Sequence, residues 1–247
     1  MDRLLEATAR AERDHFWFRG FRRFVTPLFD QAAARRHDLL MLDCGCGTGH
    51  NLQLLRQAGR AFGIDITRSG LAYAASRGDR KVAQASVGRL PFGPDLFDIV
   101  TSFDVIYSLP DDVERAAVSE MWRVLKPGGH LLLNVAAMPI LHGSHSVLSG
   151  EIRRYSKSGL RQLLEASGFQ IERITYTNFS ILPLTAGVRL AQKVLGGHKE
   201  SAAEITIPPA PVNTLLSALL AGEAAVLTFV DMPAGSSLLC LARKPLS

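Results

Sequence analysis

A glycine-rich stretch directly after a short apolar run constrains the fold of this chain more than any other feature of its sequence. Residues 39–42 are all apolar, Asp43 follows them, and a helical stretch begins at residue 51. Between them lie three alternating glycines: Gly45, Gly47 and Gly49. A strand, a glycine loop and a helix in this order are typical of the first unit of a parallel α/β sheet.

The alternation of apolar runs with helical periodicity continues along the chain. Runs that predict further strands lie at 60–66, 81–85, 97–103, 130–135, 169–176 and 237–243. Helical spacing falls between them and also predicts helices at 2–36, 181–196 and 211–230. We therefore expect an α/β protein with a parallel sheet and helices on both of its faces.

Length and composition favour a single domain. The chain has 247 residues, of which 47% are hydrophobic and 21% charged, an ordinary globular composition. We expect one domain over 1–247, divided into an N-terminal helical lid (1–36), the core (37–179), a helical insertion that forms a cap (180–235) and the last strand (236–247).

The charge pattern and the apolar segments bear on partners and location. The formal net charge is +5, but the basic residues are scattered, so we expect a solvated basic surface and no nucleic-acid partner. The first residues lack the apolar stretch of a signal peptide, which predicts a cytoplasmic protein. The most apolar window, 212–230, has Glu223 near its centre and predicts a buried or surface-lying helix rather than an integral span. Peripheral membrane contact stays open.

The cysteines Cys44, Cys46 and Cys240 are odd in number and lack disulfide-framework spacing, which is typical of a reducing compartment. Cys44 and Cys46 have neither a second cysteine pair nor a neighbouring histidine to complete a metal site. We predict no metal and interpret them as small residues that pack a tight turn.

The glycine loop lies where a parallel sheet binds its ligand, beyond the carboxyl ends of the strands. Its D-x-G-x-G-x-G spacing differs from the G-x-G-x-x-G that cradles a pyrophosphate, and it suits a narrower amino-acid group. Asp43 is placed to hold an ammonium, and Asp65, at the end of the second strand, to accept from ribose hydroxyls. The alternatives are a tight turn without a ligand and a solvated Asp65.

Four segments, in this order, resemble the class I S-adenosylmethionine-dependent methyltransferases of the small-molecule type. They are LLMLDCGCGTG (39–49), FGID (62–65), RLPFGPDLFDIV (89–100) and RVLKPGGHLLL (123–133). The resemblance extends to HFWFRG (15–20), RRYSKSGLRQLLEASGF (153–169) and MPAGSSLLCLARKP (232–245). It implies a Rossmann-like, doubly wound sheet of seven strands, mostly parallel with the last strand antiparallel, and S-adenosylmethionine as the cofactor.

The resemblance also implies roles for residues at the strand ends. Asp43 and the loop would surround the methionine part of the cofactor, Asp65 would bind the ribose, and Ile66 and Val87 would sandwich the adenine. Val87 as a plain core residue is the alternative. The predicted cofactor-binding residues are Asp43, Gly45, Cys46, Gly47, Gly49, Asp65, Ile66, Ser86, Val87, Ser102, Phe103, Trp17 and Arg19.

The chain departs from the family in two places. Family members usually have an acid at the position of Ser86, so adenine recognition differs in detail. Relatives often have a Glu-His pair where this chain has Tyr107 and Ser108. In addition, residues 103–106 lack the Asn/Asp-Pro-Pro-aromatic element of enzymes that methylate the amines of nucleic-acid bases, which argues against such substrates.

Methyl transfer from a sulfonium is an in-line displacement that depends mostly on positioning, but a hydroxyl or carbon acceptor must also lose a proton. A histidine is the usual base near neutral pH. His142 and His145 lie in a loop that this topology places over the pocket mouth, and they are the leading candidates, with Tyr155, Glu151 and Tyr107 weaker. Solvated loop histidines are the alternative.

Two segments bear on the acceptor and the lid. The aromatic residues 16–18 and Arg19 form either a lid over the sulfonium, with Arg19 near the cofactor carboxylate, or ordinary core packing. The apolar segment 180–235 either shapes a pocket for an apolar acceptor, such as a polyketide, terpenoid or lipid intermediate, or forms a homodimer interface.

We therefore expect a methyltransferase that uses S-adenosylmethionine for O- or C-methylation of a small, apolar molecule. The first alternative is an enzyme that binds the same cofactor and catalyses a non-methylating rearrangement or cyclisation. A non-catalytic partner subunit is disfavoured by the intact glycine loop, and a nicotinamide oxidoreductase by the glycine spacing.

Overall fold

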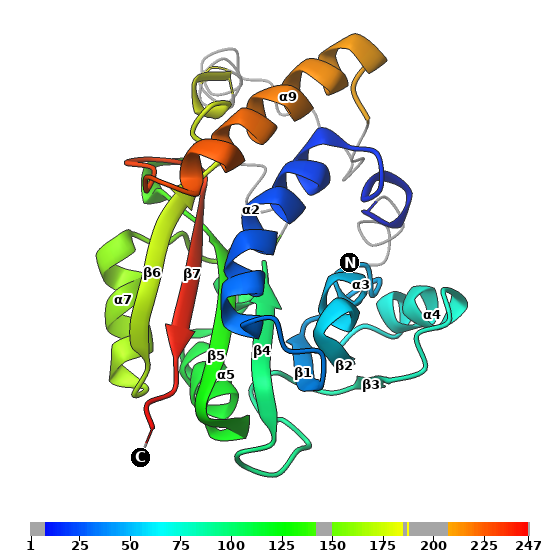
Figure 1. The fold of residues 1–247 in the computed structure, drawn as a ribbon, viewed down its shortest axis with the longest axis vertical. Coiled ribbons are helices and arrows are strands. Elements are labelled where there is room, and N and C mark those ends of the chain that lie inside the picture. The colour runs from blue at the N-terminus through cyan, green and yellow to red at the C-terminus, as the bar shows by residue number, and fades with distance from the viewer. Residues whose placement is uncertain (1–7, 142–149, 185–186, 188–206, 247) are drawn as a thin grey trace.

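The computed structural model describes residues 8–141, 150–184, 187 and 207–246, which contain a seven-stranded sheet (Figure 1). The order across the sheet is β3-β2-β1-β4-β5-β7-β6, and β7 runs antiparallel to both of its neighbours. The other pairs are parallel, so the predicted sheet with an antiparallel last strand is confirmed. The strands are β1 (Leu39–Cys44), β2 (Gly59–Asp65), β3 (Val82–Gln84), β4 (Phe97–Phe103), β5 (Leu125–Ala136), β6 (Gln170–Thr177) and β7 (Ser237–Arg243).

The ends of β1, β2 and β4 lie next to one another. Leu42 of β1 pairs with Phe62 of β2 on one side and with Val100 of β4 on the other. Because these strands run in the same direction, the residues that follow each of them emerge at one edge of the sheet. The glycine loop after β1, Ile66 after β2 and Asp104 after β4 therefore share this carboxyl edge.

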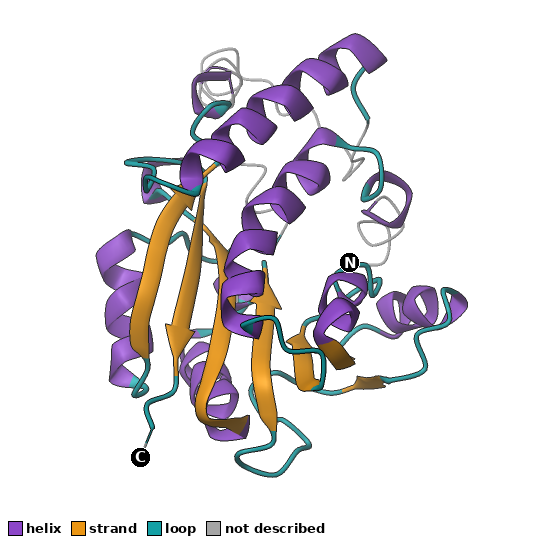
Figure 2. Ribbon diagram, viewed as in Figure 1, coloured by secondary structure: helices purple, strands orange, loops and turns teal. Residues whose placement is uncertain are grey.

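Helices cover both faces of the sheet, as Figure 2 shows. One core cluster joins the sheet to α5 and α7 through residues such as Met121 and Leu160, and the other joins it to α2, α3 and α9 through residues such as Phe29 and Leu220. The helices are α2 (Phe16–Ala33), α3 (Leu52–Leu55), α4 (Arg68–Ser76), α5 (Asp111–Val124), α7 (Lys157–Ala166) and α9 (Ala210–Leu227), with short 3₁₀ turns η1 (Arg56–Ala58), η2 (Ile106–Ser108) and η3 (Pro139–Leu141). The predicted covering of both faces is thus confirmed.

The N-terminal helix and the helical insertion pack against each other on the same face of the sheet (Figure 1). Gly20 of α2 approaches α9 so closely that a Cβ atom there would lie 2.4 Å from Cδ1 of Leu220. The side chain of Asn213 accepts from the Phe16 N–H and donates to the Asp14 carbonyl, both at 2.8 Å. The start of α9 therefore fixes the start of α2.

Among the described residues, α9 is the one helix long and apolar enough to cross a membrane by length and composition. One such helix is weak evidence for a span, because core helices of soluble proteins pass the same test. Glu223 of α9 is buried and accepts hydrogen bonds from the N–H groups of Phe179 and Ser180 and from the Ser180 hydroxyl. This packing agrees with the predicted buried or surface-lying helix.

Two predicted elements differ from the structure, and a third lies mostly outside the described residues. The described part of 2–36 is two pieces, because the chain turns at residues 12–14 before α2 begins at Phe16. The strand predicted at 130–135 begins earlier, because α5 ends at Val124 and Leu125 already pairs with Phe97 as part of β5. Most of the helix predicted at 181–196 lies outside the described residues.

Candidate functional site

The glycine loop after β1 has a backbone that favours glycine at each of its three positions. Gly45, Gly47 and Gly49 have φ values of 84°, 49° and 79°, in the left-handed region. At Gly45 there is a second reason, because a Cβ atom would lie 2.2 Å from Cγ2 of Val105. The N–H groups of Gly45 and Cys46 donate to the Ile64 carbonyl at 2.8 Å, which ties the loop to β2.

Asp43 lies beneath this loop with a carboxyl group that is only partly satisfied. The residue is 1% exposed, and its Oδ1 accepts a 2.7 Å hydrogen bond from the Thr101 hydroxyl. Its buried Oδ2 has no hydrogen-bond partner among the described residues. Burial raises the pKa of Asp43 to about 7; the bond from Thr101 opposes this rise, and the nearby Asp65 adds to it. An ammonium group is the kind of ligand that would satisfy this oxygen.

Asp65, at the end of β2, holds the loop from the other side. Its Oδ2 accepts a 2.8 Å hydrogen bond from the Gly47 N–H. Its Oδ1 accepts from both the N–H and the hydroxyl of Thr67. A carboxylate has about four lone-pair sites, so these bonds leave capacity for a ribose hydroxyl. The predicted ribose role remains a prediction.

The residues predicted around the adenine lie in different settings. Ile66 is 63% exposed directly after β2, which leaves its side chain free to pack on a ligand. Ser86 is exposed, and its hydroxyl accepts from the Gly88 N–H at 3.2 Å. Val87 is 6% exposed and belongs to the core, as the alternative interpretation held, so only its backbone is available to a ring.

The remaining predicted cofactor residues lie around the end of β4 and on α2. Ser102 is buried, and its hydroxyl has no hydrogen-bond partner among the described residues. Phe103 packs edge-on against Phe21 of α2, with ring centroids 5.1 Å apart. Trp17 is half-buried against the α2 side of the core, whereas Arg19 is exposed on the same helix.

Of the three predicted catalytic residues, the structure describes only Tyr155. His142 and His145 lie outside the described residues. Tyr155 is 7% exposed in the core cluster beneath α5 and α7, and its hydroxyl donates to Glu114. Burial raises the pKa of the Tyr155 phenol well above its usual range. This geometry makes the phenol a buried hydrogen-bond partner of Glu114, and the predicted role of Tyr155 as a base stays a prediction.

Sequence analysis missed Asp104, which follows β4 at the same edge as the glycine loop. Its backbone has a φ of 60°, and its N–H and Oδ1 bind the Asn134 carbonyl and amide at 3.0 and 2.9 Å. The residue keeps an exposed surface, yet protein surrounds its carboxyl closely enough for desolvation to raise its pKa to about 7. The hydrogen bond from Asn134 and the positive charge of Arg154 oppose this rise in pKa, whereas the negative charge of Glu151 adds to it. The position directly after the fourth strand is the sequence signal that marks it.

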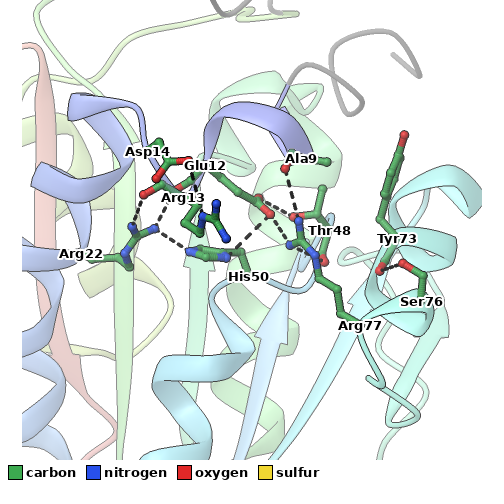
Figure 3. A network of polar contacts seen from close by, with 10 residues as sticks. All are labelled: Ala9, Glu12, Arg13, Asp14, Arg22, Thr48, His50, Tyr73, Ser76 and Arg77. Atoms are coloured by element: carbon green, nitrogen blue, oxygen red, sulfur yellow. Dashed lines mark hydrogen bonds and ion pairs between the residues drawn. The ribbon is translucent and has the colours of Figure 1, made fainter. Parts of the chain in front are cut away.

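Sequence analysis also missed Glu12, whose side chain enters the glycine loop (Figure 3). Its Oε2 accepts a 2.6 Å hydrogen bond from the Thr48 hydroxyl, and its Oε1 pairs with Arg77.

No group of three or more His, Cys, Asp or Glu residues in the described part of the chain is placed to hold a metal ion. Cys44 and Cys46 are both buried, one in each core cluster. The site is thus built from carboxylates, glycine backbone and hydroxyls.

Comparison with known proteins agrees with this geometry. The family model described as a methyltransferase domain matches residues 42–133, which hold the glycine loop, Asp65 and Asp104. A probable S-adenosylmethionine-dependent methyltransferase of Mycolicibacterium smegmatis is 29% identical over 64% of this chain and 61% of its own length. The chain thus matches about three fifths of that relative. The ubiquinone/menaquinone biosynthesis C-methyltransferase UbiE of Stutzerimonas stutzeri is 28% identical over 64% of this chain and 76% of its own length.

Solved structures share the fold. The [4+2]-cyclase SpnF superposes with a TM-score of 0.59 at 23% identity, over 90% of this chain and 80% of that chain. At this identity the likeness shows the fold alone. The matching domain, the curated relatives and the carboxylate-lined glycine loop agree on one conclusion: residues 42–133 are a methyltransferase domain, and the chain is similar to S-adenosylmethionine-dependent methyltransferases.

Proposed function

We propose that this protein transfers the methyl group of S-adenosylmethionine to a small, apolar acceptor, at oxygen or carbon. The observation that carries the proposal is the buried Oδ2 of Asp43, which has no hydrogen-bond partner in the described part of the chain and lies beside a loop without room for a side chain at Gly45 or Gly49. A cofactor with an ammonium group supplies the positively charged hydrogen-bond donor that this oxygen lacks. When bound, S-adenosylmethionine supplies an electrophilic methyl group.

The chain's own residues bind and orient the cofactor and accept the proton of the acceptor. Asp43 binds the ammonium group at the amino-acid end of the cofactor, Asp65 orients the ribose, and the exposed face of Ile66 packs on the adenine. Most of the acceleration comes from holding the acceptor in line and excluding water. The Asp104 carboxylate, with a pKa raised to about 7, takes the proton of a hydroxyl or carbon acid at its free oxygen.

An apolar acceptor is supported by side chains at the carboxyl edge of the sheet. Ile140, which follows β5, is 86% exposed, and Phe179, which follows β6, is 42% exposed. Large apolar side chains exposed beside a ligand site are a feature of surfaces that bind apolar molecules. The printed name of the S. stutzeri relative, a C-methyltransferase of ubiquinone and menaquinone biosynthesis, supports carbon methylation as one form of the reaction. A cytoplasmic location, peripheral membrane contact and a homodimer stay predictions.

The test is incubation of the purified chain with methyl-labelled S-adenosylmethionine and a panel of quinols, phenols and fatty acids. We expect label in one product class and a mass gain of one methylene group. A product of unchanged mass, formed equally with S-adenosylhomocysteine, would instead identify the non-methylating rearrangement. No binding of either cofactor form by calorimetry would overturn both functions.

A further inference from the structure

The N-terminal segment, residues 8–15, is tied to the glycine loop through one buried carboxylate (Figure 3). Glu12 is 3% exposed, and besides Thr48 and Arg77 it lies 3.7 Å from Nδ1 of His50. Thr48 and His50 belong to the loop after β1, whereas Arg77 directly follows α4. Glu12 therefore joins three separate parts of the chain, and we call these four residues the Glu12 cluster.

Arginines also hold the backbone of the N-terminal segment in place. Arg77 donates to the Ala9 carbonyl at 3.3 Å, and Arg22 of α2 donates to the Glu12 carbonyl at 2.9 Å. The same Arg22 nitrogen lies 2.6 Å from Nε2 of His50. Since an arginine only donates, His50 is neutral and accepts at Nε2. Removal of the Glu12 carboxylate would leave Arg77 without its anionic partner and would take away a negative charge near Arg22.

We infer that Glu12 is a positioning residue of the cofactor site, which fixes the loop around Thr48 in the conformation that receives S-adenosylmethionine. The inference rests on the proposed function, because it concerns the same cofactor. It adds a residue outside the matched methyltransferase domain, which begins at residue 42. It also makes the N-terminal segment a part of the cofactor site.

The physical reason lies in the glycines on either side of Thr48. Gly47 and Gly49 are the most flexible residues of the loop, and both stand in the left-handed region. The Thr48 hydroxyl is held by Glu12 and its carbonyl by Arg77, at 3.5 Å, while the Gly47 N–H is held by Asp65. A loop that is already ordered loses less conformational entropy when it binds a ligand, so these contacts favour cofactor affinity.

The inference is tested by calorimetric titration with S-adenosylhomocysteine, which needs no acceptor. We expect Glu12→Ala and Thr48→Val each to raise the dissociation constant about tenfold, the size expected for a hydrogen bond to a charged group. The double variant should be little weaker than Glu12→Ala alone, because both changes remove the same bond. Thr48→Ser keeps the hydroxyl and should restore wild-type affinity.

A matched control lies at the opposite edge of the sheet. Asp98 accepts hydrogen bonds from the Leu40 N–H, Lys126 and Arg36. Like Glu12→Ala, Asp98→Asn therefore removes a carboxylate that has cationic partners. We expect Asp98→Asn to lower the melting temperature without a change in the dissociation constant. In the wild type, the ligand should also slow amide hydrogen exchange in residues 9–15, and Glu12→Ala should lose this effect.

Each outcome bears on the inference in a distinct way. Equal affinity of wild type, Glu12→Ala and Thr48→Val would overturn the positioning role and leave the proposed function intact. An equal loss of affinity in Asp98→Asn would also overturn it, because the effect would then be one of general stability. A wild type without affinity for S-adenosylhomocysteine would overturn the proposed function itself.

Discussion

The Gly47 N–H donates a 2.8 Å hydrogen bond to Oδ2 of Asp65, and this contact joins the glycine loop to the end of the neighbouring strand. The same carboxylate also accepts from Thr67 at the start of α4. One side chain thus sets the relative positions of the loop after β1 and the turn after β2. We therefore expect stability and cofactor binding to be coupled at this residue.

We expect Asp65→Ala to lower the free energy of unfolding by about 2 kcal/mol, because it leaves the Gly47 and Thr67 donors without their acceptor. It should also weaken S-adenosylhomocysteine binding more than about tenfold. Chemical denaturation and calorimetry measure the two effects. The control is Asp38→Ala, which removes an exposed carboxylate paired only with Arg36 among the described contacts and should leave both quantities almost unchanged. Wild-type affinity in Asp65→Ala would contradict the ribose role.

A second prediction concerns Gly45, where backbone conformation and space both exclude a side chain. Gly45→Ala should cost about 3 kcal/mol of stability, from a left-handed alanine and from the clash with Val105. Gly78 separates the two causes, since it has a φ of 88° and a Cβ atom there would meet nothing within 4 Å. Gly78→Ala should therefore cost only about 1–2 kcal/mol.

Addition of Val105→Ala to Gly45→Ala removes the atom that lies 2.2 Å from the new methyl group. We expect this double variant to recover part of the stability that Gly45→Ala loses, although the valine change alone is destabilising. Urea denaturation of the wild type, the two single variants and the double variant measures the coupling. Strict additivity of the two changes would show that the close approach does not govern the glycine requirement.

The parts of this protein that follow from local sequence were predictable. Strand β4 has the predicted bounds because Phe97–Phe103 is rich in aromatic and β-branched residues and follows the proline turn at 90–94. Asp43 and Asp65 stood out because each ends a strand beside a glycine loop or a helix start. Residues at the carboxyl ends of neighbouring parallel strands lie at one edge of the sheet, so the common location of Asp43 and Asp65 follows from topology alone.

The parts that depend on distant contacts were not predictable. Glu12 and Thr48 are separated by 36 positions. The hydrophobic periodicity of the N-terminal segment does not distinguish the buried Glu12 from the solvated acidic residues near it in the sequence. The break in the N-terminal helix at residues 12–14 accompanies the same contact, since the chain turns where Glu12 enters the loop. The contact of Tyr155 with Glu114 of α5 likewise joins residues 41 positions apart.

A third prediction concerns Asp104 as the proton acceptor. Asp104→Asn keeps the shape of the side chain and should lower the rate of methyl transfer about a hundredfold, within the range for a general base. The wild-type rate should rise with pH up to about 7, because only the ionised carboxylate takes a proton. The variant should lose this rise. Asp111→Asn, at an exposed site in the helix after β4, is the control.

A readout without substrate is available for the same residue. The pKa of Asp104 is raised in the folded state above its ordinary value of 3.8, so its contribution to stability is full below that value and is lost as pH rises through about 7. Asp104→Asn should flatten this part of the stability curve. Glu151, Arg154, Asn134 and Tyr107 surround the carboxyl and are unchanged in the variant. An identical curve for both proteins would contradict the raised pKa.

The last prediction concerns the coupling of cofactor binding to the ionisation of Asp43. Its folded-state pKa of about 7 means that half of the molecules carry the proton near neutral pH. The ammonium of S-adenosylhomocysteine favours the ionised carboxylate, so binding must expel that proton. We expect affinity to rise about tenfold between about pH 6 and about pH 8, as the ionised fraction grows. Asp43→Asn should bind more weakly and show only the pH dependence of the ligand itself.

Calorimetry in buffers of different ionisation enthalpy counts the protons released on binding. The wild type should release a fraction of a proton below pH 7 that Asp43→Asn does not release. Asp65 and Thr101, the groups that face this carboxyl, are the same in both proteins, so the difference between them belongs to Asp43. Equal proton release by the two proteins would show that the unpartnered oxygen does not meet the cofactor's ammonium group.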